Sequence, residues 1–383
     1  MSSDSKPEPG VFYVCRNKNE DNTVTAGADG LIDKALWRDK ESCARYFAKL
    51  SIIAHETLQN LRRSNASAVL WTPMLRALSL GPSVFIKLES EQITNSFKVR
   101  GAINCVKHAS GKQIVTASTG NHALAVAHAV QLLGKQGTIF LPTNVAEGKL
   151  AALKQATITA NCELWILGND CLQAEIAASE HAAANNAVYV SPYNDEHVIA
   201  GQGTIGIEIL DYFSRSYPSF SGSRKCCYIT VGGGGLISGI AAVLKANQPD
   251  EWRIIGCLPQ NSPVMYDCVK AGCVVDSNCA ETLSDGSAGS IEENTITFEA
   301  CSCLVDAWAI VAEDDIAAAM YDTLKDEKKL LEGAAGVAVA GYKKDSKWRE
   351  QNICIASVLV ACGGNVDVGT IRHVISVQSK KGQ

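Results

Sequence analysis

One lysine of this chain occupies a setting in which its amine could bind a carbonyl compound covalently. Lys98 stands between Phe97 and Val99, within residues 95–101. A lysine amine can form a Schiff base with an aldehyde, and when neutral it can also act as a general base. A single lysine beside a phenylalanine is usually structural or solvated. Other segments must therefore decide whether Lys98 does this chemistry.

A run of four glycines follows the apolar residues 228–231 and precedes an expected helix. It comprises Gly232, Gly233, Gly234 and Gly235, and Leu236 opens the helix. Glycines permit positive φ, so successive amides can converge on an anion, and the start of a helix favours negative charge. This order favours a phosphate cradle. A flexible loop is the alternative, and a dinucleotide-binding turn would need a glycine where Ser238 stands.

A polar loop joins the strand expected at residues 114–117 to an alanine-rich helix expected over 121–133. It consists of Ser118, Thr119, Gly120, Asn121 and His122. Backbone amides at the start of a helix suit a carboxylate ligand. A plain capping turn explains the same residues, because serine and threonine are common N-caps. Alone, this loop favours the capping turn.

A fourth segment follows the strand expected at residues 353–360. It is the sequence Cys362, Gly363, Gly364 and Asn365. Cys362 on its own could be a buried structural thiol.

In order along the chain, these four segments resemble the active-site segments of fold-type II pyridoxal-phosphate (PLP) enzymes, most of all the serine/threonine dehydratase and serine racemase family. The resemblance covers about residues 71–369. It implies that Lys98 carries PLP as a Schiff base and later removes the Cα proton of the substrate. The implied cofactor contacts are Phe97, Lys98, Asn121, Gly232, Gly233, Gly234, Gly235, Leu236, Glu332 and Cys362. The implied substrate contacts are Ser118, Thr119, Gly120, Asn121, His122, Tyr193 and Asp285.

Short apolar strands alternate with helices along most of the chain, which predicts an α/β fold of parallel sheets covered on both faces. The resemblance adds two domains of the tryptophan synthase β type, with the cofactor in the cleft between them. The large domain is expected at residues 31–111 and 194–383, and the small inserted domain at 112–193. Residues 1–30 are polar and are expected to form a loosely ordered arm.

Several positions depart from the family pattern. Thr119 replaces the serine whose hydroxyl acts as a second acid/base in racemases, and its extra methyl stiffens χ1. Leu258 replaces a glutamate of metal-dependent relatives, and leucine cannot bind a divalent cation, so no metal is expected. Gly333 and Ala334 follow Glu332 where many relatives have proline and a hydroxyl residue, which leaves a surface helix cap open for Glu332. For Asp285 a simple turn is the alternative.

The predicted reaction is dehydration of a 3-hydroxy amino acid such as serine or threonine, which gives a 2-keto acid and ammonia. The resemblance places the neutral Cys362 beside the pyridine nitrogen, where it would not hold a proton as an aspartate would. That favours β-elimination. Lys98 and Thr119 are the expected catalytic residues. An amino-acid racemase is the main alternative, and a β-replacement synthase or a non-catalytic protein of the PLP fold are more remote ones.

Composition limits the other classes of function. The chain has 383 residues, 46% of them hydrophobic, and a net charge of −5 without a basic block, which argues against nucleic acid as a partner. Fifteen cysteines with no C-x-x-C pair indicate a reducing compartment rather than a disulfide scaffold. No stretch is apolar enough to predict a membrane span. The expectation is a cytoplasmic enzyme, and the family suggests a homodimer.

Overall fold

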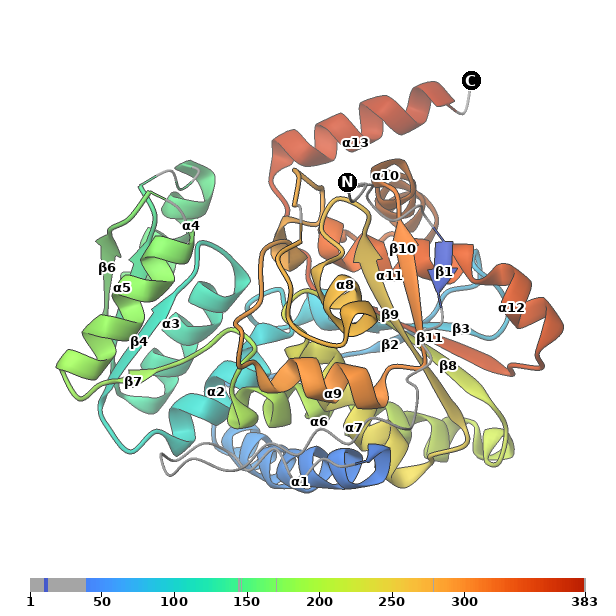
Figure 1. Cartoon of the computed structure of the whole chain (residues 1–383), viewed down its shortest axis with the longest axis horizontal. Helices are drawn as coiled ribbons and strands as arrows, with labels where there is room; N and C mark the ends of the chain where they lie inside the picture. Colours follow the sequence, from blue (N-terminus) through green and yellow to red (C-terminus); the bar gives the residue numbers. More distant parts are fainter. Residues whose placement is uncertain are drawn as a thin grey trace.

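The computed structural model describes residues 10–12, 39–143, 145, 147–169, 171–277 and 279–381. They form two α/β domains, each built on its own sheet (Figure 1). Alternating strands and helices produce this arrangement, because a strand buried on both faces needs helices above and below it. The predicted α/β class with two domains is confirmed.

The larger sheet has seven strands in the order β1-β10-β9-β8-β11-β3-β2. Its five central strands are parallel to their neighbours, whereas β1 and β2 pair antiparallel at the two edges. The bounds are β1 Gly10–Phe12, β2 Met74–Arg76, β3 Val84–Leu88, β8 Lys225–Thr230, β9 Trp252–Pro259, β10 Ala307–Val311 and β11 Ala356–Ala361. Every residue of the five central strands is buried.

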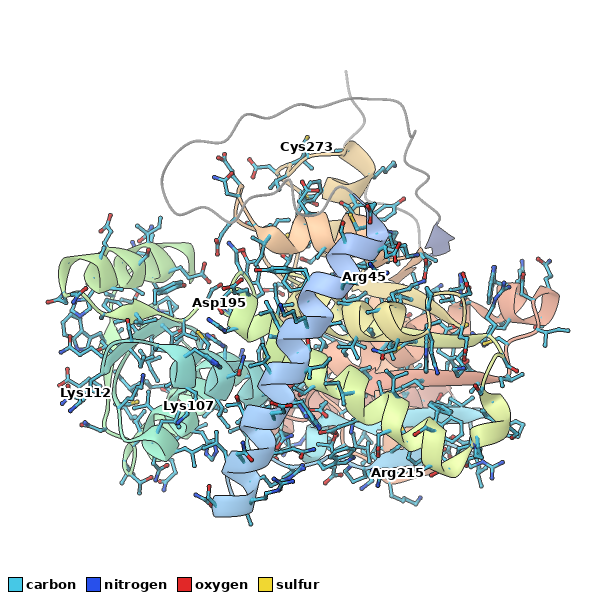
Figure 2. All side chains as sticks on the ribbon, turned by 90° about the horizontal axis from the view of Figure 1, so that it is seen from below. Arg45, Lys107, Lys112, Asp195, Arg215 and Cys273 are labelled. Atoms are coloured by element: carbon cyan, nitrogen blue, oxygen red, sulfur yellow. The ribbon has the colours of Figure 1, made fainter. Side chains whose placement is uncertain are left out.

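Helices cover both faces of the larger sheet. Helices α6 (Glu196–Ser216) and α7 (Gly235–Asn247), backed by α1 (Lys40–Ser64), lie on one side. Helix α11 (Gly333–Lys344), backed by α10 (Glu313–Asp322), packs against β8, β9, β10 and β11 on the other. Figure 2 shows α1 crossing the underside of the molecule. The remaining helices of this domain are α8 Val264–Ala271, α9 Ile296–Leu304, α12 Ser346–Gln351 and α13 Val368–Lys381.

The smaller sheet has four parallel strands in the order β6-β5-β4-β7. They are β4 Gln113–Ala117, β5 Gln136–Leu141, β6 Cys162–Ile166 and β7 Val188–Tyr189. Helices α3 (Asn121–Leu133) and α5 (Cys171–Ala184) pack on this sheet, and α4 (Glu147–Thr157) packs beside α3. Helix α2 (Lys98–His108) packs against both α3 and α6, so it lies between the two domains.

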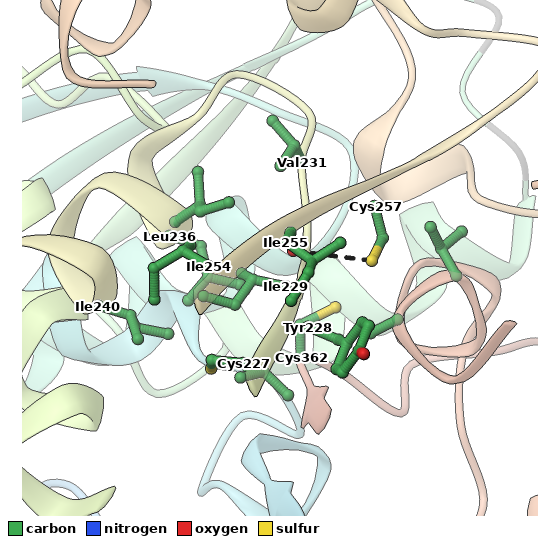
Figure 3. Close-up of a cluster of buried hydrophobic side chains, with 14 of the residues drawn as sticks. Cys227, Tyr228, Ile229, Val231, Leu236, Ile240, Ile254, Ile255, Cys257 and Cys362 are labelled. Atoms are coloured by element: carbon green, nitrogen blue, oxygen red, sulfur yellow. Dashed lines mark hydrogen bonds between the residues drawn. The ribbon is translucent and has the colours of Figure 1, made fainter. Parts of the chain in front are cut away.

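The core of the larger domain contains several cysteines among its aliphatic side chains (Figure 3). Cys227 of β8 and Cys257 of β9 are fully buried, and Cys362 lies in the same cluster. Buried thiols of this kind behave as small apolar groups. The residue that follows β11 therefore belongs to the same buried core as strands β8 and β9.

The structure corrects two expectations about the boundaries of elements. Gly10–Phe12, within the arm expected at residues 1–30, forms strand β1 paired with β10, and the rest of that arm lies outside the described residues. The strand expected at residues 353–360 is Ala356–Ala361, and the residues before it lie outside the sheet, with Ile353 89% exposed. In the part of the chain that is described, no helix is both long and apolar enough to cross a membrane.

Candidate active site

Lys98 is the first residue of helix α2, and its side chain is largely withdrawn from solvent. Its Nζ donates a hydrogen bond to the carbonyl oxygen of Pro192 at 2.7 Å. Burial lowers the pKa of Lys98 to about 8, although the nearby Glu332 and Glu175 favour the charged form. Near neutral pH the amine can therefore lose its proton far more easily than a surface lysine can.

The segment before Lys98 is hydrogen-bonded to the segment that starts at Cys362. The amide of Phe97 donates to the carbonyl of Cys362 at 3.0 Å, and the amide of Gly364 donates to the carbonyl of Asn95 at 2.9 Å. Burial raises the pKa of the Cys362 thiol well above its usual range, so this side chain is neutral. Two segments more than 260 residues apart in the sequence thus meet beside the lysine amine.

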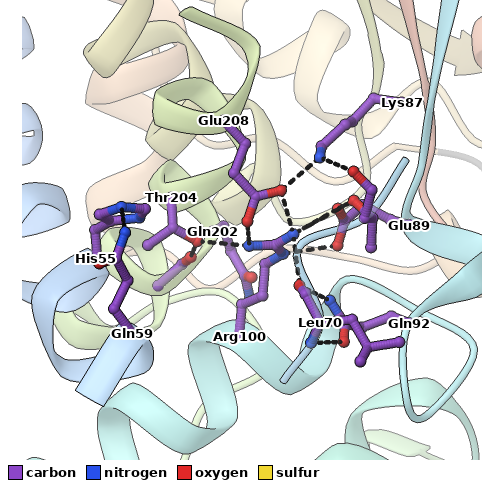
Figure 4. Close-up of polar contacts among 12 residues, drawn as sticks. His55, Gln59, Leu70, Lys87, Glu89, Gln92, Arg100, Gln202, Thr204 and Glu208 are labelled. Carbon is purple, nitrogen blue, oxygen red and sulfur yellow. Dashed lines mark hydrogen bonds and ion pairs between the residues drawn. The ribbon is translucent and has the colours of Figure 1, made fainter. Parts of the chain in front are cut away.

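An ionic network fixes the helix that carries Lys98 (Figure 4). Arg100 donates from Nε to Glu89 at 2.8 Å and from Nη1 to Glu208 at 2.7 Å. Lys87 pairs with the other oxygen of Glu208. These side chains come from β3, from the turn after it, from α2 and from α6, and all are buried. The first turn of α2 is therefore held to the larger domain.

The glycine run forms the turn between β8 and α7. Gly234 has a φ of +85°, which favours glycine. Among the described residues, no acceptor takes a hydrogen bond from the backbone amides of residues 232–235. Four free amides at the start of α7 fit a phosphate group, which supplies several acceptor oxygens and negative charge.

Space beside this turn is filled by Tyr193. A Cβ on Gly233 would lie 2.3 Å from the Tyr193 ring, and one on Gly235 would lie 3.0 Å from the Tyr193 Cα. The Tyr193 hydroxyl accepts a hydrogen bond from the amide of Glu292 at 3.1 Å. Tyr193 was expected in the substrate pocket; here its ring lines the glycine turn, and its contact with substrate stays a prediction.

We expect Gly233→Ala to weaken cofactor binding, because the new Cβ must displace the Tyr193 ring and shift the amides of the turn. The dissociation constant for PLP, measured by titration after the cofactor is removed, should rise by about tenfold or more. Gly148→Ala is the matched control, since a Cβ there meets nothing within 4 Å. Equal affinities in the two variants would contradict this role of the turn.

Asn121 connects the two domains. It is the first residue of α3 in the smaller domain, and its Nδ2 donates to both carboxylate oxygens of Glu332 at 2.8 and 3.0 Å. Its Oδ1 accepts a hydrogen bond from Nδ2 of Asn365 at 2.7 Å. The loop at residues 118–122 is thus brought to the segments that carry Glu332 and Cys362.

Glu332 is buried, with 5% of its surface exposed, and its side chain does not cap helix α11. The alternative of a surface helix cap was therefore wrong. Burial raises the pKa of Glu332 to about 7. The glycine that follows it also has a structural reason, because a Cβ on Gly333 would lie 1.7 Å from the carbonyl oxygen of Leu283.

Two expected substrate contacts have other partners. Asp285 is exposed, and its carboxylate pairs with Nζ of Lys149 at 2.6 Å. The buried imidazole of His122 lies 3.0 Å from the carbonyl oxygen of Val190, and burial lowers its pKa to about 3. The Ser118 hydroxyl accepts a hydrogen bond from the amide of Gly120 at 3.3 Å, and Thr119 lies between these two residues in the loop. Contact of these four residues with substrate stays a prediction.

Several residues that contact the residues of the candidate site were not predicted. The backbone carbonyl of Pro192 accepts the hydrogen bond from Lys98, and no pattern of side chains predicts such a contact. Glu175 on α5 is electrostatically coupled to Lys98, and burial raises its pKa to about 7. Lys149 is an ordinary helix residue in the sequence. Asn365 belongs to the segment that starts at Cys362, and that segment was the signal that could have assigned Asn365 to the site.

No group of three or more potential metal ligands occurs within the described ranges.

Comparison with known proteins decides the family. Residues 66–362 match the family described as "Pyridoxal-phosphate dependent enzyme". The chain belongs to that family. Its cofactor is therefore PLP, and the lysine, the glycine turn and the neutral thiol described above are the chemical groups that such a cofactor needs around it.

Individual relatives agree with this family. The chain is 36% identical to the L-threonine ammonia-lyase of Thermotoga maritima over 331 residues, which are 84% of this chain and 76% of that protein. Its structure is similar to the processed form of threonine deaminase isoform 2 from Solanum lycopersicum, with a TM-score of 0.73 and 30% identity over 85% and 88% of the two chains. It is also similar to maize serine racemase, with a TM-score of 0.72 and 26% identity over 85% and 98%.

Proposed function

We propose that this PLP-dependent enzyme is an ammonia-lyase that converts a 3-hydroxy amino acid of the serine or threonine type to a 2-keto acid and ammonia. The observation that carries the proposal is the buried amine of Lys98, positioned beside the neutral thiol of Cys362. The threonine ammonia-lyase and threonine deaminase relatives support this substrate class.

The residues that would hold the cofactor come from both domains. The amides of residues 232–235, with Leu236 at the start of α7, would bind the phosphate. Lys98 would bind the aldehyde carbon beside Phe97, Asn121 would contact the ring hydroxyl, and Cys362 the ring nitrogen. When bound, PLP withdraws electrons from the Cα atom of the amino acid. A neutral thiol at the ring nitrogen limits this withdrawal and favours elimination.

The chain itself supplies orientation and proton transfer. The amides of the loop at residues 118–122, at the start of α3, would hold the substrate carboxylate. Held in this way, the Cα–H bond can point toward Lys98, whose neutral amine removes the proton. The Thr119 hydroxyl would lie on the opposite face of the substrate, as the family arrangement implies.

The test is a panel of 3-hydroxy amino acids in both enantiomers, with release of 2-keto acid and ammonia as the readout. Release from L-threonine or L-serine is the expected result. A racemase is the second candidate, and the likeness to maize serine racemase favours it. Formation of the opposite enantiomer without keto acid would establish the racemase instead. Neither product from any member of the panel would contradict both.

We expect kcat to rise with pH through the pKa of Lys98, because only the neutral amine can accept the Cα proton. Burial lowers that pKa to about 8, and the Glu332 carboxylate opposes the lowering. Glu332→Gln removes this opposing charge, so the rise in kcat should move to lower pH. A pH profile of kcat measures the shift. Asp211→Asn, on α6, changes a carboxylate that pairs with Arg215 and should leave the profile unchanged. A shift toward higher pH in Glu332→Gln would contradict the expectation.

We also propose that the enzyme works in the cytoplasm as a homodimer. Free thiols at all the cysteines that the structure describes fit a reducing compartment. The dimer rests on the family resemblance. Light scattering of the purified holoenzyme should give twice the mass of 40.7 kDa, and a monomer mass at micromolar concentration would contradict it.

A further inference from the structure

Two cysteines on the larger sheet lie unusually close together, away from the cofactor residues. The Sγ atoms of Cys226 and Cys354 are 3.1 Å apart, although 128 positions separate the residues in the sequence. A disulfide bond is about 2.0 Å long, so only a small movement of the two sulfur atoms separates this contact from a bond.

The sheet itself brings the two thiols together. Strands β8 and β11 are parallel neighbours, with Ser357 opposite Cys226. Cys226 lies near the start of β8, and Cys354 comes just before β11. The Cys354 thiol also donates to the carbonyl oxygen of Ala356 at 3.1 Å. Pairing of β8 with β11 therefore brings the segment just before β11, which carries Cys354, beside Cys226.

The two thiols differ in exposure. Cys226 is fully buried, whereas Cys354 is partly exposed and follows Ile353, which is 89% exposed. A reagent in solution can therefore reach Cys354 first, and Cys226 lies directly behind it. This is the arrangement of an attacking thiol with a resolving partner.

The surroundings favour the thiolate of Cys354. The sulfur contact with Cys226, together with the side chain of Ser357 and the nearby Arg349, lowers the pKa of Cys354 to about 7. The same contact raises the pKa of Cys226. Arg349 is held over the Tyr342 ring at 3.7 Å, so its charge stays beside the pair. Thiolates, not thiols, attack disulfides.

We propose that Cys226 and Cys354 form a redox-active dithiol that low-molecular-weight disulfides oxidise to an intramolecular disulfide. The Cys354 thiolate attacks one sulfur of the oxidant, forms a mixed disulfide and releases one thiolate. Cys226 then loses its proton and attacks the Cys354 sulfur, which forms the Cys226–Cys354 bond and releases the second thiolate. Two protein thiols are oxidised and one disulfide of the oxidant is reduced to two thiols, so atoms and electrons balance.

The bond would act on stability rather than on the chemistry of Lys98. Gly232 and Cys362 lie beyond the C-terminal ends of β8 and β11. The Cys226–Cys354 bond would instead join the N-terminal ends of these two strands. A cross-link between distant positions restricts the unfolded chain. We therefore expect the oxidised enzyme to keep its activity and to unfold at a temperature several degrees higher than the reduced enzyme.

The test treats the native holoenzyme with oxidised glutathione, alkylates the remaining thiols and maps disulfide-linked peptides by mass spectrometry. The expected product links Cys226 to Cys354 and disappears with dithiothreitol. Cys227→Ala should keep the link, which separates the two adjacent cysteines of β8. Cys354→Ser should lose both the link and the rise in unfolding temperature. Cys226→Ser should leave Cys354 joined to glutathione.

The exposed Cys273, which lies outside the sheet, reports whether the oxidant reached the protein (Figure 2). Modification of Cys273 while Cys226 and Cys354 remain alkylated as free thiols would overturn the proposal. A link from either residue to a different cysteine would also overturn it. Because the wild-type enzyme alone gives these readings, the result does not depend on whether a variant folds.

Discussion

We expect the Lys98→Ala variant to lose lyase activity almost completely. The residue would supply both the covalent attachment of the cofactor and the base that removes the Cα proton, and positioned proton transfer alone typically contributes about 10²–10⁴-fold to a rate. The protein-bound absorbance at about 410–420 nm, and its loss on treatment with sodium borohydride, report the bond between cofactor and lysine. Both signals should be absent from the variant.

Lys107→Ala is the matched control for this experiment. Lys107 lies in the last turn of the same helix α2 and is exposed (Figure 2). It should keep full activity and the cofactor band. If Lys98→Ala kept the band and full release of keto acid, Lys98 would be neither the attachment point nor the base, and the proposed function would lose its main support. Circular dichroism of both variants would exclude a difference in folding.

Local patterns in the sequence predicted the segments that meet in this candidate site, while the roles of their residues stay predictions. The glycine run was recognisable because glycine is the residue that tolerates a φ of +85° before a helix, as found at Gly234. Strand and helix periodicity predicted an α/β chain with parallel sheets, and the buried central strands have the continuous apolar character that parallel pairing requires. The order of the four segments then assigned Lys98, Asn121 and Cys362.

Contacts between distant segments were not predictable in the same way. The bond from Lys98 to Pro192 uses a backbone carbonyl, which every residue has. Glu332 could have been a surface cap because the residues that follow it are all small, and its burial becomes visible only when Asn121 reaches it from the other domain. Side-chain spacing describes one element at a time, whereas these partners depend on how two domains meet.

The second large effect is expected from Arg100, which sequence patterns did not distinguish from a surface arginine. Arg100 lies between Glu89 and Glu208, and the exposed fraction of each of the three side chains is 2% or less. Lys87 pairs with Glu208 on its other side and is equally buried. The network thus contains two positive and two negative groups, and removal of either cation leaves a buried carboxylate without compensation.

We expect Arg100→Met to lower the free energy of unfolding by about 3–5 kcal/mol, the usual cost when one partner of a buried ion pair is removed. The thermal midpoint of unfolding should fall by several degrees or more. The pair between Arg215 and Asp211 is the control, because the Arg215 side chain is 77% exposed (Figure 2). Arg215→Met should cost no more than about 0.3–0.5 kcal/mol. Equal effects of the two substitutions would show that the buried network contributes no more to the free energy of unfolding than an exposed ion pair does.

A substitution at Arg100 also tests how the fold positions Lys98. Arg100 lies two residues further along helix α2 and donates hydrogen bonds to Glu89, which follows β3, and to Glu208 of α6. Arg100→Lys keeps the charge but cannot bridge Glu89 and Glu208 with the same fork of donors. We expect it to recover part of the lost stability while kcat stays reduced, since α2 would be held less rigidly and the Lys98 amine would be less well aligned with the Cα proton. An Arg100→Lys variant with restored stability and wild-type kcat would show that the network stabilises the fold without positioning Lys98.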